Sequence, residues 1–363
     1  MIDRLSLSRF RNHRETLLDG AAPRFNLLVG ENGAGKTNVL EAISLFAPGR
    51  GLRRAALADM AMQDGAQDDT GGFAVSADLA AASDTVRLGT GMAPERPGRR
   101  IVHINHADAP AIRLAEWLGI GWLTPAMDRL FTDSAGARRR WLDRLVLAME
   151  PGHAARAARL ENALRERNRM LADERTPDST WFDAVETQIA TAGSAVAQAR
   201  AAMVARLDAA LRDLPVSPFA RPSLAYLPGG PVQADALAAA LAQGRRRDSA
   251  AQRTLTGPHR DELAVSMAGK ETAAADCSTG EQKAMLIAIT LAHAELCDAG
   301  RPRLLLLDEV AAHLDPVRRH ALFERLRAGS AQVWLTGTEL APFADIAQEA
   351  AVWRVSGGSA ERL

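Results

Sequence analysis

The sequence is poor in lysine, in aromatic residues and in cysteine for a chain of 363 residues. Only three of its 44 basic residues are lysines, so arginine carries almost all of the positive charge. The 44 basic residues are balanced by 44 acidic residues, which makes the formal net charge at pH 7 zero. This balance excludes a protein that coats nucleic acid through its overall charge, so any basic surface must be local. The low aromatic content, 4%, predicts cores built from leucine, alanine and valine.

Long apolar runs and paired cysteines are also missing. The stretches 114–123 and 284–296 are too short or too polar to span a bilayer, and the first residues lack the apolar core of a signal peptide. Cys277 and Cys297 match neither a zinc motif nor a disulfide framework, and we interpret them as reduced thiols. We therefore expect a cytoplasmic protein with no membrane association. The length allows about two domains of ~150 residues each.

The residue pattern changes twice along the chain. Residues 1–125 alternate short apolar runs with glycine, proline and aspartate, residues 126–250 are rich in helix-forming residues, and residues 251–363 return to the first pattern. We predict an α/β fold in which lobe I (1–125 and 251–363) is split in sequence by a mainly helical lobe II (126–250). Strands are expected at 24–29, 73–77, 86–88, 101–104, 304–307, 332–335 and 351–355, and helices at 38–46, 154–171, 181–214, 284–296 and 317–326.

The strongest motif lies between the first of these strands and the first helix. Residues 30–37 read GENGAGKT and match the phosphate-binding loop pattern G-x-x-x-x-G-K-[ST]. Glycines let the backbone N–H groups wrap a phosphate, and the helix that follows adds its positive N-terminal end. Lys36 is expected to reach the β- and γ-phosphates of ATP, and Thr37 to bind Mg²⁺. The nucleotide contacts predicted for this loop are Gly30, Glu31, Asn32, Gly33, Ala34, Gly35, Lys36, Thr37 and Asn38.

A second motif is an apolar strand that ends in two carboxylates. Residues 304–307 are all leucine and are followed by Asp308 and Glu309, which is the Walker B pattern. Asp308 is expected to hold Mg²⁺ together with Thr37, and Glu309 to orient or deprotonate the attacking water. Alone, the run also fits a buried strand with a solvated acidic end. The phosphate-binding loop upstream favours the catalytic interpretation.

Two further segments indicate an ATPase of the ABC type. Ser278 and Glu281 form an S-x-x-E capping box before the helix at 284–296, which by itself requires only a well-capped helix. Gly280 and the position just before the Walker B strand favour an ABC signature, whose serine hydroxyl and glycine amide meet the γ-phosphate bound by the opposite subunit. Asp315 lies in a segment that fits the D-loop between two ATP sites, and it also fits the N-cap of the next helix.

The order of these motifs resembles the ABC ATPase heads of the SMC-like group, and within that group the RecF family of bacterial recombination-repair proteins. Residues 5–13 are similar to the opening strand of the family with its FRN motif, which here contains Arg11 and Asn12. Residues 134–143, 164–171 and 257–262 resemble three further blocks of the family. The similarity runs from residue 5 to beyond residue 315.

The resemblance implies an ATP-dependent DNA-binding protein of recombinational repair and replication. ATP and Mg²⁺ would be its cofactors, and two copies would pair around two nucleotides. The expected partners are DNA at single-strand gaps and at junctions with double-stranded DNA, and the mediator RecR, which acts with RecO to help load the recombinase RecA. By the same resemblance, Arg11 and Asn12 lie near the nucleotide.

The sequence departs from the family and leaves alternatives open. No glutamine occurs at 124–128, where related ATPases place one near the metal, and residues 336–338 occupy the place of the switch histidine of transporters, so slow hydrolysis is expected. A transporter-type ATPase subunit and a nucleotide-binding scaffold without turnover remain alternatives. Arginines at 53–54, 138–140 and 245–247 are candidates for DNA phosphate contacts, or are ordinary paired surface residues. Lys270 has no assigned role.

Overall fold

The computed structural model describes residues 1–63, 71–80, 85–173, 178–215, 217–270, 272–296, 300–311 and 314–363. The chain forms two compact units: unit 1 comprises Met1–Met127 and Cys297–Leu363, and unit 2 comprises Asp128–Leu296. Cys297 itself and the first two residues of the predicted D-loop segment, 312–313, lie outside the described residues.

The division of the chain differs from the lobes expected from the sequence. The first crossing lies two residues after the predicted boundary at 125, but residues 251–296 belong to unit 2 instead of lobe I. Two contacts explain the difference: β9 (Pro222–Leu227) pairs antiparallel with β10 (Glu262–Met267), and α7 (Thr279–Leu296) packs against α5 (Ser179–Arg212). The signature segment is therefore part of unit 2.

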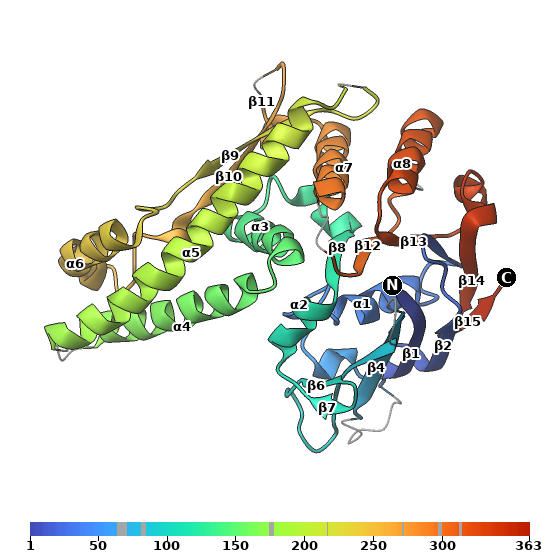
Figure 1. Cartoon of the computed structure of the whole chain (residues 1–363), viewed down its shortest axis with the longest axis horizontal. Helices are drawn as coiled ribbons and strands as arrows, with labels where there is room; N and C mark the ends of the chain where they lie inside the picture. Colours follow the sequence, from blue (N-terminus) through green and yellow to red (C-terminus); the bar gives the residue numbers. More distant parts are fainter. Residues whose placement is uncertain are drawn as a thin grey trace. The chain divides into compact units, whose positions relative to one another are not determined.

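Unit 1 contains a mainly parallel sheet of six strands (Figure 1). Neighbouring strands are parallel from β14 to β8, and β15 closes one edge in the antiparallel sense. The central strands β3, β12 and β13 are buried along their whole length, which explains why apolar residues dominate them. The strands in spatial order are β15 (Ser359–Arg362), β14 (Ala350–Ser356), β3 (Phe25–Val29), β13 (Gln332–Gly337), β12 (Arg303–Leu307) and β8 (Gly119–Leu123).

A second six-stranded sheet of unit 1 is antiparallel throughout. In β1 and β4 buried and solvated residues alternate, as expected where one face covers a core. Its strands in spatial order are β2 (His13–Asp19), β1 (Ile2–Phe10), β4 (Phe73–Ala80), β5 (Thr85–Met92), β6 (Ile101–Ile104) and β7 (Ala107–Asp108). The helices of unit 1 are α1 (Lys36–Ser44), α2 (Leu114–Trp117) and α8 (Pro316–Ala328).

The helix α1 lies in the core that both sheets of unit 1 share. Val39, Leu40 and Ile43 are completely buried in one hydrophobic cluster with residues of β1, β4, β12 and β13. The end of the helix is held by Arg100, whose guanidinium donates to the carbonyl oxygens of Leu45 and of Gly49 (2.8 Å). Burial lowers the pKa of Arg100 to about 10, so the group is still charged at neutral pH. Both faces and the C-terminal end of α1 are therefore fixed.

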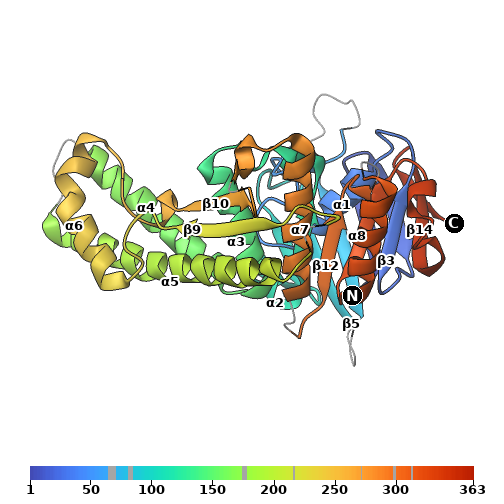
Figure 2. The ribbon, with the colours of Figure 1, turned by 90° about the horizontal axis from the view of Figure 1, so that it is seen from above.

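Unit 2 combines five helices with a three-stranded antiparallel sheet in the part of the chain that the structure describes. The helices α4 and α5 run side by side, and β9 and β10 extend along α5 (Figure 2). The remaining elements are α3 (Ala135–Met149), α4 (His153–Ala172), α6 (Ala234–Ala250) and β11 (Thr272–Ala273). The strand β9 was not expected within residues 126–250, because its half-solvated pattern is short and begins at Pro222.

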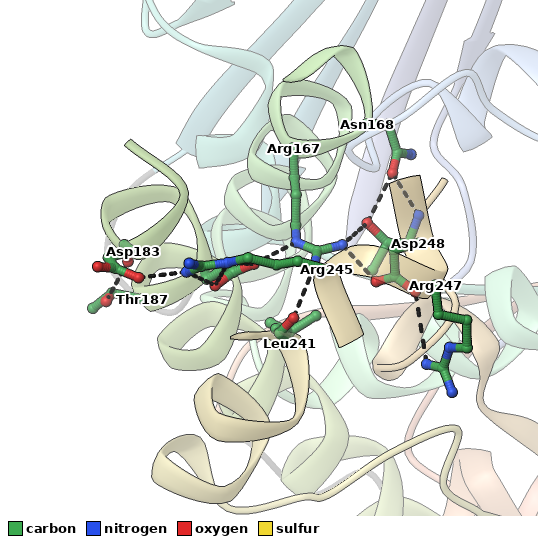
Figure 3. Close-up of polar contacts among 10 residues, drawn as sticks. Arg167, Asn168, Asp183, Thr187, Leu241, Arg245, Arg247 and Asp248 are labelled. Carbon is green, nitrogen blue, oxygen red and sulfur yellow. Dashed lines mark hydrogen bonds and ion pairs between the residues drawn. The ribbon is translucent and has the colours of Figure 1, made fainter. Parts of the chain in front are cut away.

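An arginine buried in unit 2 joins three helices (Figure 3). The side chain of Arg167 on α4 is fully buried; it donates to Glu186 of α5 (3.0 Å) and to Asp248 of α6 (2.8 Å). It also donates to the carbonyl oxygen of Leu241 (3.0 Å). Arg245 adds a second guanidinium to Glu186. Buried carboxylates are costly unless they are paired, so the packing of α4, α5 and α6 depends on Arg167.

We predict that Arg167→Met strongly destabilises unit 2, because it leaves the carboxylate of Asp248 buried without its main partner. The expected loss in the free energy of unfolding is about 3–5 kcal/mol, measured by urea titration followed by circular dichroism. Arg169→Ala is the matched control, two residues along α4, with a side chain that is 75% exposed and, among the described residues, pairs with Glu166 alone. The control should leave the urea midpoint unchanged; an equal loss in both variants contradicts the role of Arg167.

Candidate nucleotide site

The phosphate-binding loop runs from the end of β3 to the start of α1, as the sequence predicts. Two of its glycines are required by geometry. A Cβ atom on Gly30 would lie 2.1 Å from the carbonyl oxygen of Val355 in β14, so only glycine lets the chain pass there. Gly35 is the N-cap of α1 with φ 117°, a conformation that other residues rarely adopt. The loop therefore leads directly into the N-terminus of α1, and a helix N-terminus is a favourable place for a phosphate.

Lys36 is buried, and its ammonium group is held inside the loop. The side-chain nitrogen Nζ donates to the carbonyl oxygens of Gly30 (2.6 Å) and Glu31 (2.9 Å). It also lies 3.7 Å from Oε1 of Glu309. The loop lysine and the second Walker B carboxylate are thus brought together from positions 273 residues apart in the sequence. Glu31, Asn32 and Gly33 at the top of the loop are exposed.

Asp308 is the centre of a small hydrogen-bond network at the carboxyl end of β12. Its Oδ1 accepts from the hydroxyl groups of Thr37 (2.9 Å) and Thr336 (2.8 Å). Thr336 is the penultimate residue of β13, the neighbouring parallel strand, and its hydroxyl oxygen also accepts from the backbone N–H of Glu309 (2.9 Å). Glu309 has a left-handed backbone, φ 54°, which is unusual for a residue other than glycine. Thr336 therefore holds the carboxylate of Asp308 and the backbone of Glu309.

The residues predicted to bind a metal are adjacent, and their chemistry fits Mg²⁺. Thr37 and Asp308 offer one hydroxyl and one carboxylate oxygen 2.9 Å apart. Mg²⁺ is usually held by one or two protein oxygens, with phosphate oxygens and water completing its shell. Among the described residues there is no cluster of three or more histidine, cysteine, aspartate or glutamate side chains, so an all-protein metal cage is not found there.

The opening hairpin contacts the phosphate-binding loop through Asn12 and His13. The amide of Asn12 donates to the carbonyl oxygen of Ala34 (3.0 Å) and accepts from Asn38 (2.7 Å). His13 Nε2 lies 3.1 Å from the carbonyl oxygen of Gly35, and burial lowers the pKa of His13. The sequence pattern did not indicate His13. Its ring fixes the residue that caps α1.

Arg11 lies one step further from the loop. Its guanidinium forms a two-bond ion pair with Glu41 of α1 (both 2.9 Å), and the side chain of Glu41 is completely buried. Arg53, one of the candidates for DNA contacts, shares Glu41 (2.9 Å) and also donates to Asn38 (2.6 Å). Arg11 and Arg53 are therefore engaged with α1, whereas Asn12 touches the loop itself.

The signature residues form a solvated cap at the start of α7 in unit 2. Ser278 and Glu281 make the predicted capping box: the backbone N–H of Ser278 donates to Glu281 Oε2 (3.0 Å), and that of Glu281 donates to Ser278 Oγ (3.3 Å). Gly280 is exposed, and a Cβ atom there would meet nothing within 4 Å. Asp315 caps α8 in unit 1 by accepting from the N–H of Arg318 (3.0 Å).

The predicted site residues thus do not all belong to one cluster. Lys36, Thr37, Asp308 and Glu309 form one cluster in unit 1, and Ser278 belongs to unit 2. Thr336 was noted in the sequence only for its place in the order of motifs. Its contact with Asp308 depends on the neighbouring positions of β12 and β13 in a parallel sheet, which the sequence does not specify.

We predict that Thr336→Val destabilises unit 1, because it removes the hydroxyl between Asp308 and the N–H of Glu309 at a fully buried position. Leaving buried polar groups without partners should cost about 1–3 kcal/mol, measured by urea unfolding. Thr336→Ser should recover most of this loss. Thr338→Val changes the same atoms at an exposed position and serves as the control. Equal stability of the two valine variants would contradict the assigned network.

Known proteins of one family are similar to this protein along almost the whole chain. Residues 1–357 match the family described as RecF/RecN/SMC N terminal domain. The protein called DNA replication and repair protein RecF from Mesorhizobium japonicum is 46% identical, over 99% of this chain and 97% of its own length. Proteins of the same name from Rhizobium rhizogenes (43%; 98% and 97% covered) and Brucella abortus (44%; 98% and 95% covered) are similarly close.

Solved structures support the same fold. The recombination mediator protein RecF of the RecFOR pathway, determined with ATPrS, superposes with a TM-score of 0.84 at 18% identity and covers all of this chain and 98% of its own. A Pyrococcus furiosus Smc head domain gives a TM-score of 0.55 at 16% identity, with 100% and 95% covered.

These matches give no support to the alternative of a transporter subunit. None of the helices that the structure describes is both long and apolar enough to cross a membrane. The predicted ABC-type head with a split α/β lobe and an inserted helical part is confirmed in its fold class by the RecF and Smc heads. On its family match and its full-length relatives at 43–46% identity, the chain belongs to the RecF family.

Proposed function

We propose that this protein acts in DNA replication and repair as an ATPase in which ATP joins two copies and thereby controls DNA binding. The observation that carries this proposal is the convergence of Lys36, Thr37, Asp308 and Glu309 in unit 1. These four side chains supply a phosphate ligand, two metal ligands and a base within one network. Membership of the RecF family and the names of its full-length relatives point to the same process.

The chain's own groups account for each part of ATP hydrolysis. The backbone amides of the loop and Nζ of Lys36 bind the β- and γ-phosphates, while Thr37 and Asp308 hold Mg²⁺. When bound, Mg²⁺ neutralises charge on the phosphates. Glu309 accepts the proton of the attacking water, and Thr336 keeps its backbone in the conformation that aims the carboxylate at Lys36. Hydrolysis is expected to be slow, because Thr336–Thr338 replaces the switch histidine with hydroxyl and glycine residues.

The signature residues complete the site in trans. Ser278 and Gly280 are exposed at the N-terminus of the 18-residue helix α7, where backbone amides and a hydroxyl can bind an anion. The top of the phosphate-binding loop, residues 31–33, is exposed as well. We therefore place the γ-phosphate held by the loop of one copy against Ser278 and Gly280 of a second copy. The homodimer then contains two nucleotides and exists only with ATP, with Asp315 of the D-loop segment beside the shared sites.

The arginine clusters named from the sequence separate into buried and available groups. Arg138 pairs with Glu262 (2.7 Å), and Arg139 donates to the carbonyl oxygen of Asp261 (2.7 Å), so both hold α3 to β10 and its preceding turn. Arg245 is committed to Glu186 and Asp183. These side chains are parts of the scaffold of unit 2.

Three other arginines are free to bind phosphate. Arg246 on α6 and Arg253 and Arg260 in the segment that connects α6 to β10 are exposed; within the described part of the chain they have no carboxylate partner. We propose that they contact the DNA backbone, as exposed guanidinium groups commonly do. The DNA would be a single-strand gap or its junction with double-stranded DNA. RecR with RecO would be the partners that use the bound protein to help load RecA.

We predict opposite effects of two substitutions on ATP-dependent pairing. Glu309→Gln should accumulate as a dimer when ATP is added, because the nucleotide is bound but not hydrolysed. Lys36→Ala should remain monomeric at the same ATP concentration, because it loses the phosphate ligand. Sedimentation velocity with and without MgATP measures both, with Arg169→Ala as a control that behaves like the wild type. A monomeric Glu309→Gln variant at saturating ATP would contradict the proposal, and a dimer without any hydrolysis in the wild type would favour the scaffold alternative.

We also predict that the triple variant Arg246→Ala/Arg253→Ala/Arg260→Ala weakens DNA binding uniformly across sequences. If all three contact phosphates, the slope of log affinity against log salt should fall by about 2–3. Fluorescence anisotropy with a gapped duplex, with ATP and at several salt concentrations, measures both quantities. The triple variant at Arg165, Arg169 and Arg212 removes the same charge from unit 2 at side chains that have local partners. The assignment fails if both triple variants lose the same affinity and slope.

A further inference from the structure

Lys270 lies directly against the signature. It is in the turn after β10 that leads to β11, and the hairpin is fixed by the pairing of Ser266 with Ala273. From this turn its Nζ donates to Oε1 of Glu281 at 2.9 Å. The other oxygen of the carboxylate, Oε2, accepts from the backbone N–H (3.0 Å) and the hydroxyl (2.9 Å) of Ser278. One carboxylate thus connects Lys270 with the serine of the signature.

Glu281 carries a full negative charge at this place. The hydrogen bond from Lys270, together with those from Ser278, lowers the pKa of Glu281 to about 2. Lys283, the other lysine of this region, lies 3.7 Å from Asp128 and is engaged there. Lys270 is therefore the cation that is hydrogen-bonded to Glu281.

The pair has little importance for the fold. The side chain of Lys270 is 62% exposed, and exposed ion pairs contribute little to stability because water and salt screen them. The capping bonds of Ser278 use Oε2 and its own hydroxyl, not Oε1, so α7 keeps its cap without Lys270. What Lys270 does change is the charge beside the hydroxyl of Ser278.

That charge has a consequence for a phosphate that binds there. A γ-phosphate at Ser278 and Gly280 would lie next to the carboxylate of Glu281, and two anions at such a distance repel each other. The hydroxyl proton that Ser278 gives to Glu281 is also the proton that the phosphate needs. A cation on the far oxygen of the carboxylate weakens both effects, because it draws the negative charge of Glu281 toward Oε1.

We infer that Lys270 is a positioning residue of the trans-acting half of the ATP site: by compensating Glu281, it lets Ser278 and Gly280 of one copy bind the γ-phosphate held by the other copy. This inference rests on the proposed ATP-dependent dimer. It assigns a role to the third lysine of a chain whose other two lysines lie in the phosphate-binding loop and at the start of α7.

The test compares four variants with the wild type: Lys270→Ala, Lys270→Arg, Glu281→Gln, and the double variant Lys270→Ala/Glu281→Gln. Sedimentation velocity at fixed protein concentration gives the concentration of ATPγS, with Mg²⁺, at which half of the protein is dimeric. Binding of a fluorescent ATP analogue to dilute monomer is measured in parallel, because Lys270 does not belong to the loop that binds nucleotide in the monomer. Thermal melting checks the fold of each variant.

Lys270→Ala should raise the half-dimer concentration of ATPγS about fivefold to tenfold, as expected for an uncompensated charge near a phosphate in water. Its nucleotide affinity as a monomer and its melting temperature should stay unchanged, and the defect should shrink at high ionic strength. Lys270→Arg should stay within about twofold of the wild type. The double variant should return to the value of Glu281→Gln, because a neutral residue 281 needs no compensation.

Two results would overturn the inference while the proposed function stands. In the first, the wild type dimerises and Lys270→Ala has a half-dimer concentration of ATPγS within twofold of the wild-type value. In the second, the double variant is as defective in dimerisation as Lys270→Ala. The second result would mean that Lys270 touches the phosphate itself. A wild type that stays monomeric at saturating ATPγS would instead overturn the proposed function, and the inference with it.

Discussion

The burial of α1 between two sheets determines the geometry of unit 1. Its apolar residues contact the antiparallel sheet on one side and the parallel sheet on the other, and Arg100 binds the carbonyl oxygen of Leu45, the C-cap of the helix. Because the helix cannot shift, the residues at its N-terminal end have fixed positions relative to the ends of β12 and β13. The short distances between Thr37, Asp308 and Thr336 follow from that constraint. Without this packing of α1, the same side chains would be present but would not be held close enough together to form a site.

Arginine has a structural use in this protein that its composition alone does not reveal. Arg167, Arg200 and Arg100 are mostly buried, and each binds several oxygens from different elements. A guanidinium group suits such junctions because it carries five donors in a planar fork and keeps its charge when buried. Part of the charge balance therefore lies inside unit 2, where Arg167 and Arg200 pair with carboxylates. Arg246, Arg253 and Arg260, for which the described residues supply no carboxylate partner, contrast with these buried groups, and the proposed phosphate contacts rest on that contrast.

Much of the fold and of the site could be predicted from the sequence, where the signal is local. The strand at 101–104 has the predicted bounds, and the glycines of the loop, the Walker B carboxylates and the capping box of Ser278 lie where their patterns indicate. Contacts that depend on which elements lie next to a strand or a turn in space could not be predicted, because the sequence does not specify that arrangement. Thr336 meets Asp308 across parallel strands, and Lys270 meets Glu281 from a hairpin. The two compact units differ from the predicted lobes after residue 250 for the same reason, since β9 pairs with a strand that lies beyond that position.

Because unit 1 is split in sequence around unit 2, the parts of the protein can fold only in a certain order during synthesis. The antiparallel sheet needs only residues up to 108, and unit 2 is one continuous segment, so both can form while the chain is still growing. The strand β3 must wait, because its two neighbours, β13 and β14, are made only after residue 331. The candidate nucleotide site is therefore completed only after these two strands have been made. A chain that stops early would carry a finished unit 2 and an unpaired β3, whose free N–H and C=O groups could pair with another chain.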